Sequence, residues 1–188
     1  MSRLTEERFS ELYAGTLQLV AEHGYDKLTM DQIAEATKSS KATLYRQWGS
    51  KASLVVEALQ CANGPEPELP DTGTLRGDLK AMALHKGGED EADSELITAI
   101  IHAMKQNDEL AEAVRTQLIE PGRGRVKTLV QRAIDRGEVA ADCPALPFTD
   151  LLFMAPFVLS AVLEGKQINP KYMNDYFEGV VLPALGVR

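Results

Sequence analysis

Residues 30–48 read MDQIAEATKSSKATLYRQW and contain two short segments with the residue spacing of α-helices. Thr29 and Ser40 precede the two segments, and a hydroxyl side chain at such a position caps a helix by accepting a hydrogen bond from a backbone N–H. A turn of about three residues separates the segments, which is the layout of a helix-turn-helix. We therefore predict helices over 30–37 and 41–48.

The two sides of the second predicted helix carry different residues. Leu44 and Trp48 are spaced to pack on Ile33 and Ala34 of the first helix and on a helix that precedes both. Basic side chains can neutralise phosphates or bond guanine, glutamine can bond adenine, and a threonine methyl can contact thymine. Residues suited to such contacts occupy the other side: Lys41, Ala42, Thr43, Tyr45, Arg46 and Gln47. This side is therefore predicted to bind double-stranded DNA.

The net charge of −8 argues at first against a nucleic-acid partner, but the charge is unevenly distributed. The first 60 residues carry seven basic and eight acidic residues, and no acid occurs between Glu35 and Glu57. The basic residues of that window are Lys38, Lys41, Arg46 and Lys51. A locally positive surface is thus expected on an acidic protein. The same surface could instead bind an acidic protein, so an interaction module remains an alternative.

Helical spacing continues through the rest of the 188 residues and strand signals are almost absent, so the predicted fold class is all-α. Gly24 is placed to end a helix that precedes the helix-turn-helix. A loop is expected over 63–73, and Pro121-Gly122 should break or kink a helix. Further helices are expected near 51–62, 74–85, 94–106, 108–119, 123–136, 147–165 and 170–185.

The last two predicted helices, near 147–165 and 170–185, have large apolar surfaces. The segment LPFTDLLFMAPFVLSAVLEG over 146–165 is apolar on nearly every face, and Pro156 should kink it. Two such helices predict a homodimer in which they form a four-helix interface. The alternative is that they form the core of a monomer.

Residues 28–59, LTMDQIAEATKSSKATLYRQWGSKASLVVEAL, resemble the DNA-binding region of the TetR family of bacterial transcriptional regulators. The shared pattern is a Thr that opens the first short helix, Ile-Ala within it, Thr-Leu-Tyr and an aromatic residue in the second, and Lys-x-x-Leu at the start of the next. The resemblance implies a three-helix DNA-binding domain over 1–50 and a larger helical domain for ligand binding and dimerisation over 51–188, with 51–62 as the connecting helix. It further implies a ligand-responsive repressor that binds a palindromic operator as a dimer, although the residues leave repression and activation both open.

The resemblance also implies roles for single residues. Tyr45 should contact a backbone phosphate through its hydroxyl, and Thr29 and Lys51 should contact phosphates too. Arg46 should reach either a base or a phosphate. Four residues are implied to face bases in the major groove: Lys41, Ala42, Thr43 and Gln47.

The chain departs from the family pattern in two places. The turn reads Thr37-Lys38-Ser39 where Ala-Gly-Val is common, and Gln47-Trp48 replaces the usual His-Phe pair. A lysine where glycine would adopt a left-handed conformation costs on the order of 1 kcal/mol. We therefore expect a looser turn or an added phosphate contact from Lys38, and we expect Trp48 to keep the aromatic role in the core.

Members of the family bind a small-molecule effector between their central helices, and the resemblance implies an effector here, of unidentified structure. The candidate lining residues are Met82, His85, Ile101, Met104, Leu118, Phe153, Met154 and Phe157. Their methionine and phenylalanine content favours an apolar or aromatic ligand, although each residue could equally belong to the core.

The sequence contains no recognisable arrangement for catalysis or metal binding. Cys61 and Cys143 lie far apart and outside any Cys/His cluster, which argues against a disulfide framework or a zinc site and fits a reducing compartment. The three histidines have no carboxylate or cysteine at ligand spacing, so an all-helical enzyme is a disfavoured alternative and no cofactor is expected. A charged N-terminus and the lack of an apolar run of roughly 18 residues predict a cytoplasmic protein.

Overall fold

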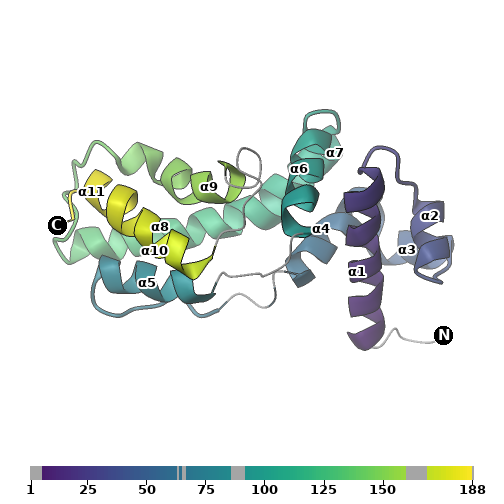
Figure 1. The fold of residues 1–188 in the computed structure, drawn as a ribbon, viewed down its shortest axis with the longest axis horizontal. Coiled ribbons are helices and arrows are strands. Elements are labelled where there is room, and N and C mark those ends of the chain that lie inside the picture. Colours follow the sequence, from purple (N-terminus) through teal and green to yellow (C-terminus); the bar gives the residue numbers. More distant parts are fainter. Residues whose placement is uncertain (1–5, 63, 65–66, 86–91, 160–168, 188) are drawn as a thin grey trace. The chain divides into compact units, whose positions relative to one another are not determined.

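The computed structural model describes residues 6–62, 64, 67–85, 92–159 and 169–187, and within these ranges the chain is helical and has no strand (Figure 1). The fold class is therefore all-α, as predicted. The first five helices are α1 (Glu6–His23), α2 (Met30–Ala36), α3 (Lys41–Trp48), α4 (Lys51–Ala62) and α5 (Leu75–His85). They are followed by α6 (Ala92–Met104), α7 (Asp108–Val114), the π-helix η1 (Arg115–Ile119) and α8 (Glu120–Asp135). The last elements are the 3₁₀-helix η2 (Leu146–Phe148), α9 (Thr149–Leu159), α10 (Pro170–Tyr176), the π-helix η4 (Phe177–Val181) and α11 (Leu182–Ala184).

The chain folds into two compact units, each with its own hydrophobic core. The first unit comprises Met1–Glu66 and Glu95–Ile119, and the second comprises Pro67–Ser94 and Glu120–Arg188. The first four helices therefore share a unit with α7, η1 and most of α6, although a long stretch of sequence separates them.

The first unit is built around α1 and α4, which pack against each other (Figure 1). Trp48, at the end of α3, lies edge-on to the rings of Phe9 and Tyr13, with centroids 6.0 Å apart in both pairs. Trp48 is thus confirmed as a core residue, and its buried Nε1 has no hydrogen-bond partner among the described residues. The Tyr13 hydroxyl donates to the Glu57 carboxylate, which joins α1 to α4. Burial, followed by this bond, raises the pKa of Tyr13. The fully buried aliphatic side chains of the unit include Leu12, Val20, Ile33, Leu44, Leu54 and Val55.

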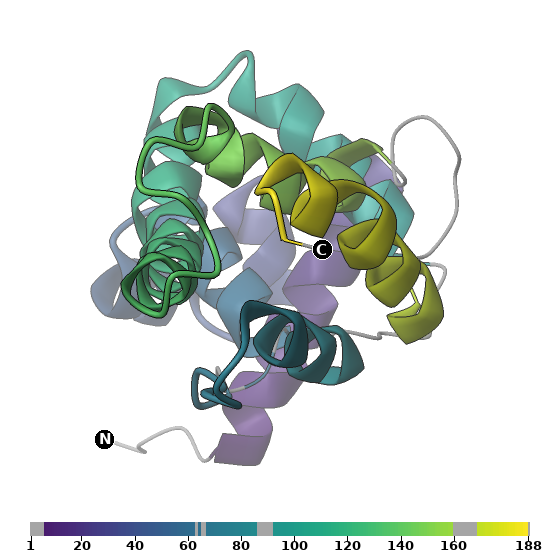
Figure 2. The same ribbon diagram turned by 90° about the vertical axis from the view of Figure 1, so that its left-hand side faces the viewer.

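The second unit packs α5, α8, α9 and α10 around an apolar centre (Figure 2). The rings of Phe153 and Phe177 lie 5.8 Å apart between centroids, and the Tyr176 hydroxyl donates to the Leu152 carbonyl at 2.9 Å. These contacts join α9 to the last helices. Further buried residues of this core are Leu75, Leu79, Leu129, Met173 and Val181.

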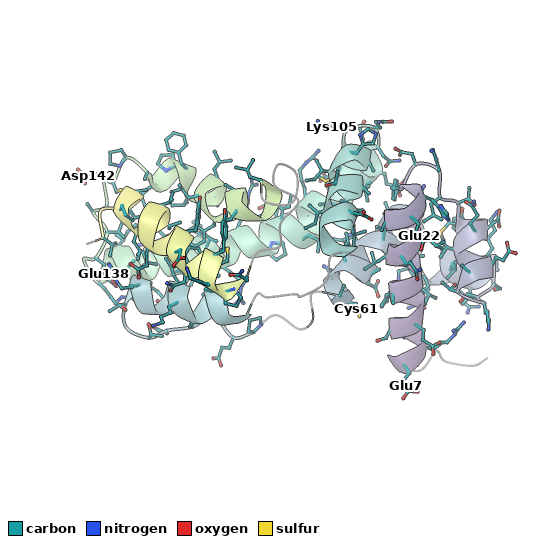
Figure 3. The ribbon with its side chains drawn as sticks, viewed as in Figure 1. Glu7, Glu22, Cys61, Lys105, Glu138 and Asp142 are labelled. Atoms are coloured by element: carbon teal, nitrogen blue, oxygen red, sulfur yellow. The ribbon has the colours of Figure 1, made fainter. Side chains whose placement is uncertain are left out.

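A polar network fixes the loop that leads into α5. Asp78 is fully buried, and its Oδ1 accepts hydrogen bonds from the backbone N and the hydroxyl of Thr72 at 2.6 and 2.8 Å. Arg136 places its Nη2 at 3.4 Å from Asp78 Oδ2. Glu138, labelled in Figure 3, accepts a bond from the Leu75 N–H at 2.8 Å and so satisfies the first residue of α5. A buried carboxylate is stable here because charged and polar partners surround it.

Prolines shape the helix ends differently from the sequence expectation. Pro121 is the second residue of α8, a position where the missing N–H is tolerated, so the helix begins at Glu120 rather than near 123. The break expected after Ile119 is absent, because the π-helix η1 leads directly into α8. Helix α9 continues through Pro156, and residues 160–165 of the predicted helix lie outside the described residues. The helix predicted over 170–185 is interrupted by the π-helix η4.

Pro121 also leaves the carbonyl of the residue four positions before it without its backbone donor. A proline has no N–H to donate to the carbonyl of Gln117. The Gln60 side chain, from the C-terminal half of α4, donates to that carbonyl at 2.8 Å. The π-helix is therefore hydrogen-bonded to α4 within the first unit.

Candidate nucleic-acid interface

The start of α2 is fixed by a reciprocal cap. Thr29 Oγ1 accepts a hydrogen bond from the Gln32 N–H at 3.3 Å, and Gln32 Oε1 accepts one from the Thr29 N–H at 2.9 Å. Two backbone donors that the first helical turn leaves unpaired are thereby satisfied. The predicted capping role of Thr29 is confirmed, and its side chain is exposed beside the helix start.

The turn after α2 is a Schellman motif. The Lys38 N–H donates to the Glu35 carbonyl at 3.1 Å, and the Ser39 N–H donates to the Ala34 carbonyl at 2.8 Å. Lys38 has a φ of +50° and is the only non-glycine residue of the described chain with a positive φ. The left-handed conformation expected at this position is therefore confirmed, with a lysine in the place that glycine usually occupies.

Helix α3 has one buried side and one exposed side. Ser40 Oγ accepts a hydrogen bond from the Thr43 N–H at 3.1 Å, which confirms Ser40 as the cap. Leu44 is fully buried and Trp48 is 7% exposed, whereas Tyr45 is 45% exposed. Thr43 is half-buried and its hydroxyl lies 2.8 Å from that of Ser40. The other predicted contact residues of α3 are exposed: Lys41, Ala42, Arg46 and Gln47.

Lys41 has an acidic neighbour that the sequence spacing did not reveal. Its Nζ lies 2.8 Å from Oδ2 of Asp31, in the first turn of α2, and both side chains are exposed. The hydrogen bond to Asp31 and the charge of that carboxylate raise the pKa of Lys41. An exposed pair of this kind adds little to stability, so another acceptor can compete with Asp31 for the ammonium.

Lys51, in the first turn of α4, is held by the loop between α1 and α2. Its Nζ donates to the carbonyls of Tyr25 and Leu28, both at 2.7 Å, and lies 3.9 Å from the centroid of the Tyr25 ring. Burial lowers the pKa of Lys51. Because an ammonium has three donors, one N–H remains for a further acceptor such as a phosphate. Lys51 thus has a structural role that the sequence analysis did not predict.

The effector candidates are distributed over both units. Met104 and Leu118 are half-buried against the first core. Phe153 is buried in the second core, and Met82 is half-buried against it. The side chains of His85 and Phe157 lie outside the described set, and the remaining two candidates, both half-buried, are Ile101 and Met154.

Two open surface hollows, of about 350 and 390 Å³, occur on the second unit. None of the effector candidates whose side chains are described lines either hollow. The first is lined by Thr74, Arg76, Glu138, Gly186 and Val187. The second is lined by Lys127, Thr128, Gln131, Arg132 and Asp135.

The described residues contain no group of three or more His, Cys, Asp or Glu side chains that could hold a metal ion. No helix among them combines the length and the apolar character needed to cross a bilayer. Both cysteines are free thiols, Cys61 exposed at the end of α4 (Figure 3) and Cys143 half-buried.

Helices α2 and α3 are short and capped, and α3 has one buried side and one exposed side with basic and polar residues. This arrangement defines a helix-turn-helix DNA-binding protein. Comparison with known families agrees with this class. The family "Bacterial regulatory proteins, tetR family" matches residues 12–58, and "Tetracyclin repressor-like, C-terminal domain" matches residues 69–180.

Individual relatives lead to the same family. The chain is 31% identical over 178 residues to an uncharacterised HTH-type transcriptional regulator of Mycobacterium tuberculosis, covering 95% of this chain and 88% of that protein. It is 35% identical over 139 residues to the DNA-binding transcriptional repressor TetR of Mycobacteroides abscessus, covering 73% of each. GusR of Salmonella enterica shares the fold with a TM-score of 0.71 at 19% identity, covering 98% of this chain and 100% of that one. The chain therefore belongs to the TetR family of bacterial transcriptional regulators, and not to a family of enzymes.

Proposed function

We propose that this regulator is a ligand-responsive repressor that binds a palindromic operator as a homodimer. The observation that carries the DNA-binding part is the division of α3 into the buried Leu44 and Trp48 and an exposed polar side. Burial fixes how the helix is rotated, so the opposite side chains project together toward a major groove. Repression is supported by the similarity to the repressor of Mycobacteroides abscessus.

The predicted contact residues divide by the part of DNA that their chemistry suits. The hydroxyls of Tyr45 and Thr29 and the third N–H of Lys51 suit phosphates, which position the protein without reading sequence. Lys41 and Gln47 suit base edges, with Ala42 and the methyl of Thr43 forming apolar contacts and Arg46 reaching a base or a phosphate.

Binding experiments separate these two kinds of contact. The wild-type protein should select duplexes from a random-sequence library and bind them with strong salt dependence. Tyr45→Phe should weaken binding to all duplexes alike, whereas Gln47→Ala should change the preference among them. Lys41→Ala should likewise change the preference among duplexes. Its matched control is Lys105→Ala, which removes a charge from the turn after α6 (Figure 3). Failure of the wild-type protein to enrich any duplex would rule out specific operator binding.

The dimer is supported by apolar side chains that the second unit leaves exposed. Phe148, Leu151 and Leu159 are 57%, 67% and 50% exposed along η2 and α9. Their spacing of three and eight residues places them on one side of a helix. Tyr172 and Val180, of α10 and η4, are 38% and 41% exposed. Monomeric proteins rarely expose large apolar patches, so a second copy of the chain is the expected cover.

Sedimentation of two matched variants tests the dimer. Leu151→Asp should shift the protein toward monomer, because the substitution introduces a charge into the apolar surface. Ala141→Asp adds the same charge at an exposed turn of the same unit and should leave the mass unchanged. A wild-type protein that sediments as a monomer at micromolar concentration would contradict the proposal.

The effector is proposed to be apolar or aromatic and to contact the second unit through Met82 and Met154. Both side chains are half-buried, and methionine adapts to ligands of varied shape. A compound that binds one conformational state better than the other shifts the population and so releases DNA. A release assay with a panel of apolar compounds tests the idea. Release that is unaffected by Met82→Ala and Met154→Ala would place the effector elsewhere.

A further inference from the structure

The side chain of Arg8 connects α1 to the turn between α2 and α3. Arg8, in the first turn of α1, donates from Nη2 to the Thr37 carbonyl, and the same nitrogen lies 3.3 Å from the Lys38 carbonyl. Its Nη1 lies 2.7 Å from Oε2 of Glu11, an exposed residue of α1. The guanidinium therefore contacts the first two residues of the turn that separates α2 from α3.

The two carbonyls that Arg8 contacts belong to Thr37, the C-cap residue of α2, and to Lys38, the residue that follows it. Carbonyls in the last turn of a helix have no intrahelical donor and carry the negative end of the helix dipole. A guanidinium supplies both donors and positive charge to such groups. Thr37 is itself buried, with its hydroxyl bonded to the Ile33 carbonyl at 2.7 Å, so the end of α2 is fixed from two sides.

This contact lies at the only non-glycine residue with a positive φ in the described part of the chain. Lys38 has a φ of +50°, and an L-residue in that region is less stable than in its ordinary conformations. The direction of the Lys38 carbonyl depends on its backbone angles, so Arg8 favours the left-handed state over the alternatives. Ser40, the cap of α3, follows two residues later, and the conformation of the turn therefore sets the direction of the recognition helix.

We propose that Arg8 is a positioning residue for DNA binding, which holds Lys38 in its left-handed conformation and thereby keeps α3 in the orientation that reads operator sequence. The inference rests on the proposed role of α3 in operator binding. Without Arg8 the competent turn is populated only part of the time, and the apparent affinity for specific DNA falls by that fraction.

The experiment measures fluorescence anisotropy with two labelled duplexes, one selected by the wild-type protein from a random library and one of shuffled sequence. Arg8→Met removes the guanidinium and keeps the aliphatic stem, while Lys38→Gly permits the left-handed turn without steric cost. Glu11→Gln is the matched control, since it removes the exposed ion pair and leaves the contacts to the turn.

Arg8→Met is expected to weaken binding to the selected duplex about tenfold more than binding to the shuffled one, which corresponds to about 1.4 kcal/mol. Lys38→Gly in the same chain should restore most of that loss, and Glu11→Gln should change neither affinity by more than about twofold. Equal losses of affinity for both duplexes would overturn the proposal in favour of a direct phosphate contact. In that case the slope of the logarithm of the binding constant against the logarithm of the salt concentration would also fall by about one. An undiminished loss in the Lys38→Gly background would also overturn it, as would unchanged binding by Arg8→Met.

Hydrogen exchange on the protein without DNA tests Arg8 even if no operator is found, or if Arg8→Met does not fold. Arg8→Lys keeps the charge but replaces the planar guanidinium by a compact ammonium on a shorter side chain. The Lys38 and Ser39 amides should then exchange several-fold faster than in the wild type, while amides at the centre of α4 keep their protection. Unchanged exchange at both turn amides would overturn the proposal. Failure of wild-type selection alone would count against operator binding and not against the turn contact.

Discussion

Replacing Lys38 by glycine should stabilise the first unit, because this residue ends α2 in a left-handed conformation with φ +50°. That conformation costs an L-residue about 1–2 kcal/mol, and the greater backbone freedom that glycine loses on folding offsets about 0.5–1 kcal/mol of the gain. The free energy of unfolding should therefore rise by about 0.5–1 kcal/mol. For a chain of this length such a gain raises Tm by about 1–4 °C.

Trp48, the only tryptophan of the chain, is buried in the same unit as Lys38 and so provides the signal. Urea unfolding followed by its fluorescence measures the change in stability. Lys38→Ala is the matched control, because it removes the same exposed side chain but keeps the Cβ that disfavours positive φ. Equal stability of the glycine and alanine variants would refute the reasoning, and so would a glycine variant less stable than the wild type.

Three further perturbations test other contacts. Lys51→Met should lower the free energy of unfolding by about 1.5–3 kcal/mol, because two bonds from the ammonium to backbone carbonyls are lost; an unchanged urea midpoint would exclude the structural role. Asp78→Asn should lower the free energy of unfolding, measured by calorimetry, by about 1–3 kcal/mol through loss of the charge beside Arg136. Asp142→Asn, at an exposed position, is its control and should have little effect. Burial, with smaller contributions from two nearby carboxylates, raises the pKa of Tyr25 from 10.0 to about 12, so the folded protein retains a proton that the unfolded chain releases. The stability that this group contributes is full below pH 10 and declines as the pH rises toward 12. The free energies of unfolding of the wild type and Tyr25→Phe are compared over this range, and a constant difference between them would contradict the raised pKa.

The helix-turn-helix was predictable because its determinants are local. The caps Thr29 and Ser40 bond backbone groups three residues ahead, and Leu44 and Trp48 lie one helical turn apart. Interactions of this range appear as fixed spacings in the sequence. Helices α3 and α4 consequently begin and end at the predicted residues, and α2 ends one residue earlier than predicted.

The contacts that fix this motif in place were not predictable from spacing. Arg8 reaches the end of α2 from α1, and Lys51 bonds carbonyls that lie 23 and 26 residues before it. Asp31 pairs with Lys41 across the turn. A polar side chain that bonds a distant carbonyl leaves no periodic pattern, so Lys51 was assigned only a phosphate contact and Arg8 was assigned no role.

The effector candidates show the limit of selection by residue type. Methionine and phenylalanine fill cores as readily as they line pockets. Phe153 packs in the core of the second unit, while Met104 and Leu118 lie against the first core. Which of two cores a helix joins depends on long-range packing, and helical periodicity carries no information about it.

The separation of α3 into two sides has a consequence for how new regulatory circuits arise. Ala42, Arg46 and Gln47 are exposed on α3. Substitution there leaves the core intact, and surface changes of this kind usually alter stability by less than about 0.5 kcal/mol. With α3 in its proposed role, a duplicated copy of such a gene acquires a different set of target promoters through a few changes in one helix. The buried Leu44 and Trp48 would preserve folding while the regulated genes diverge.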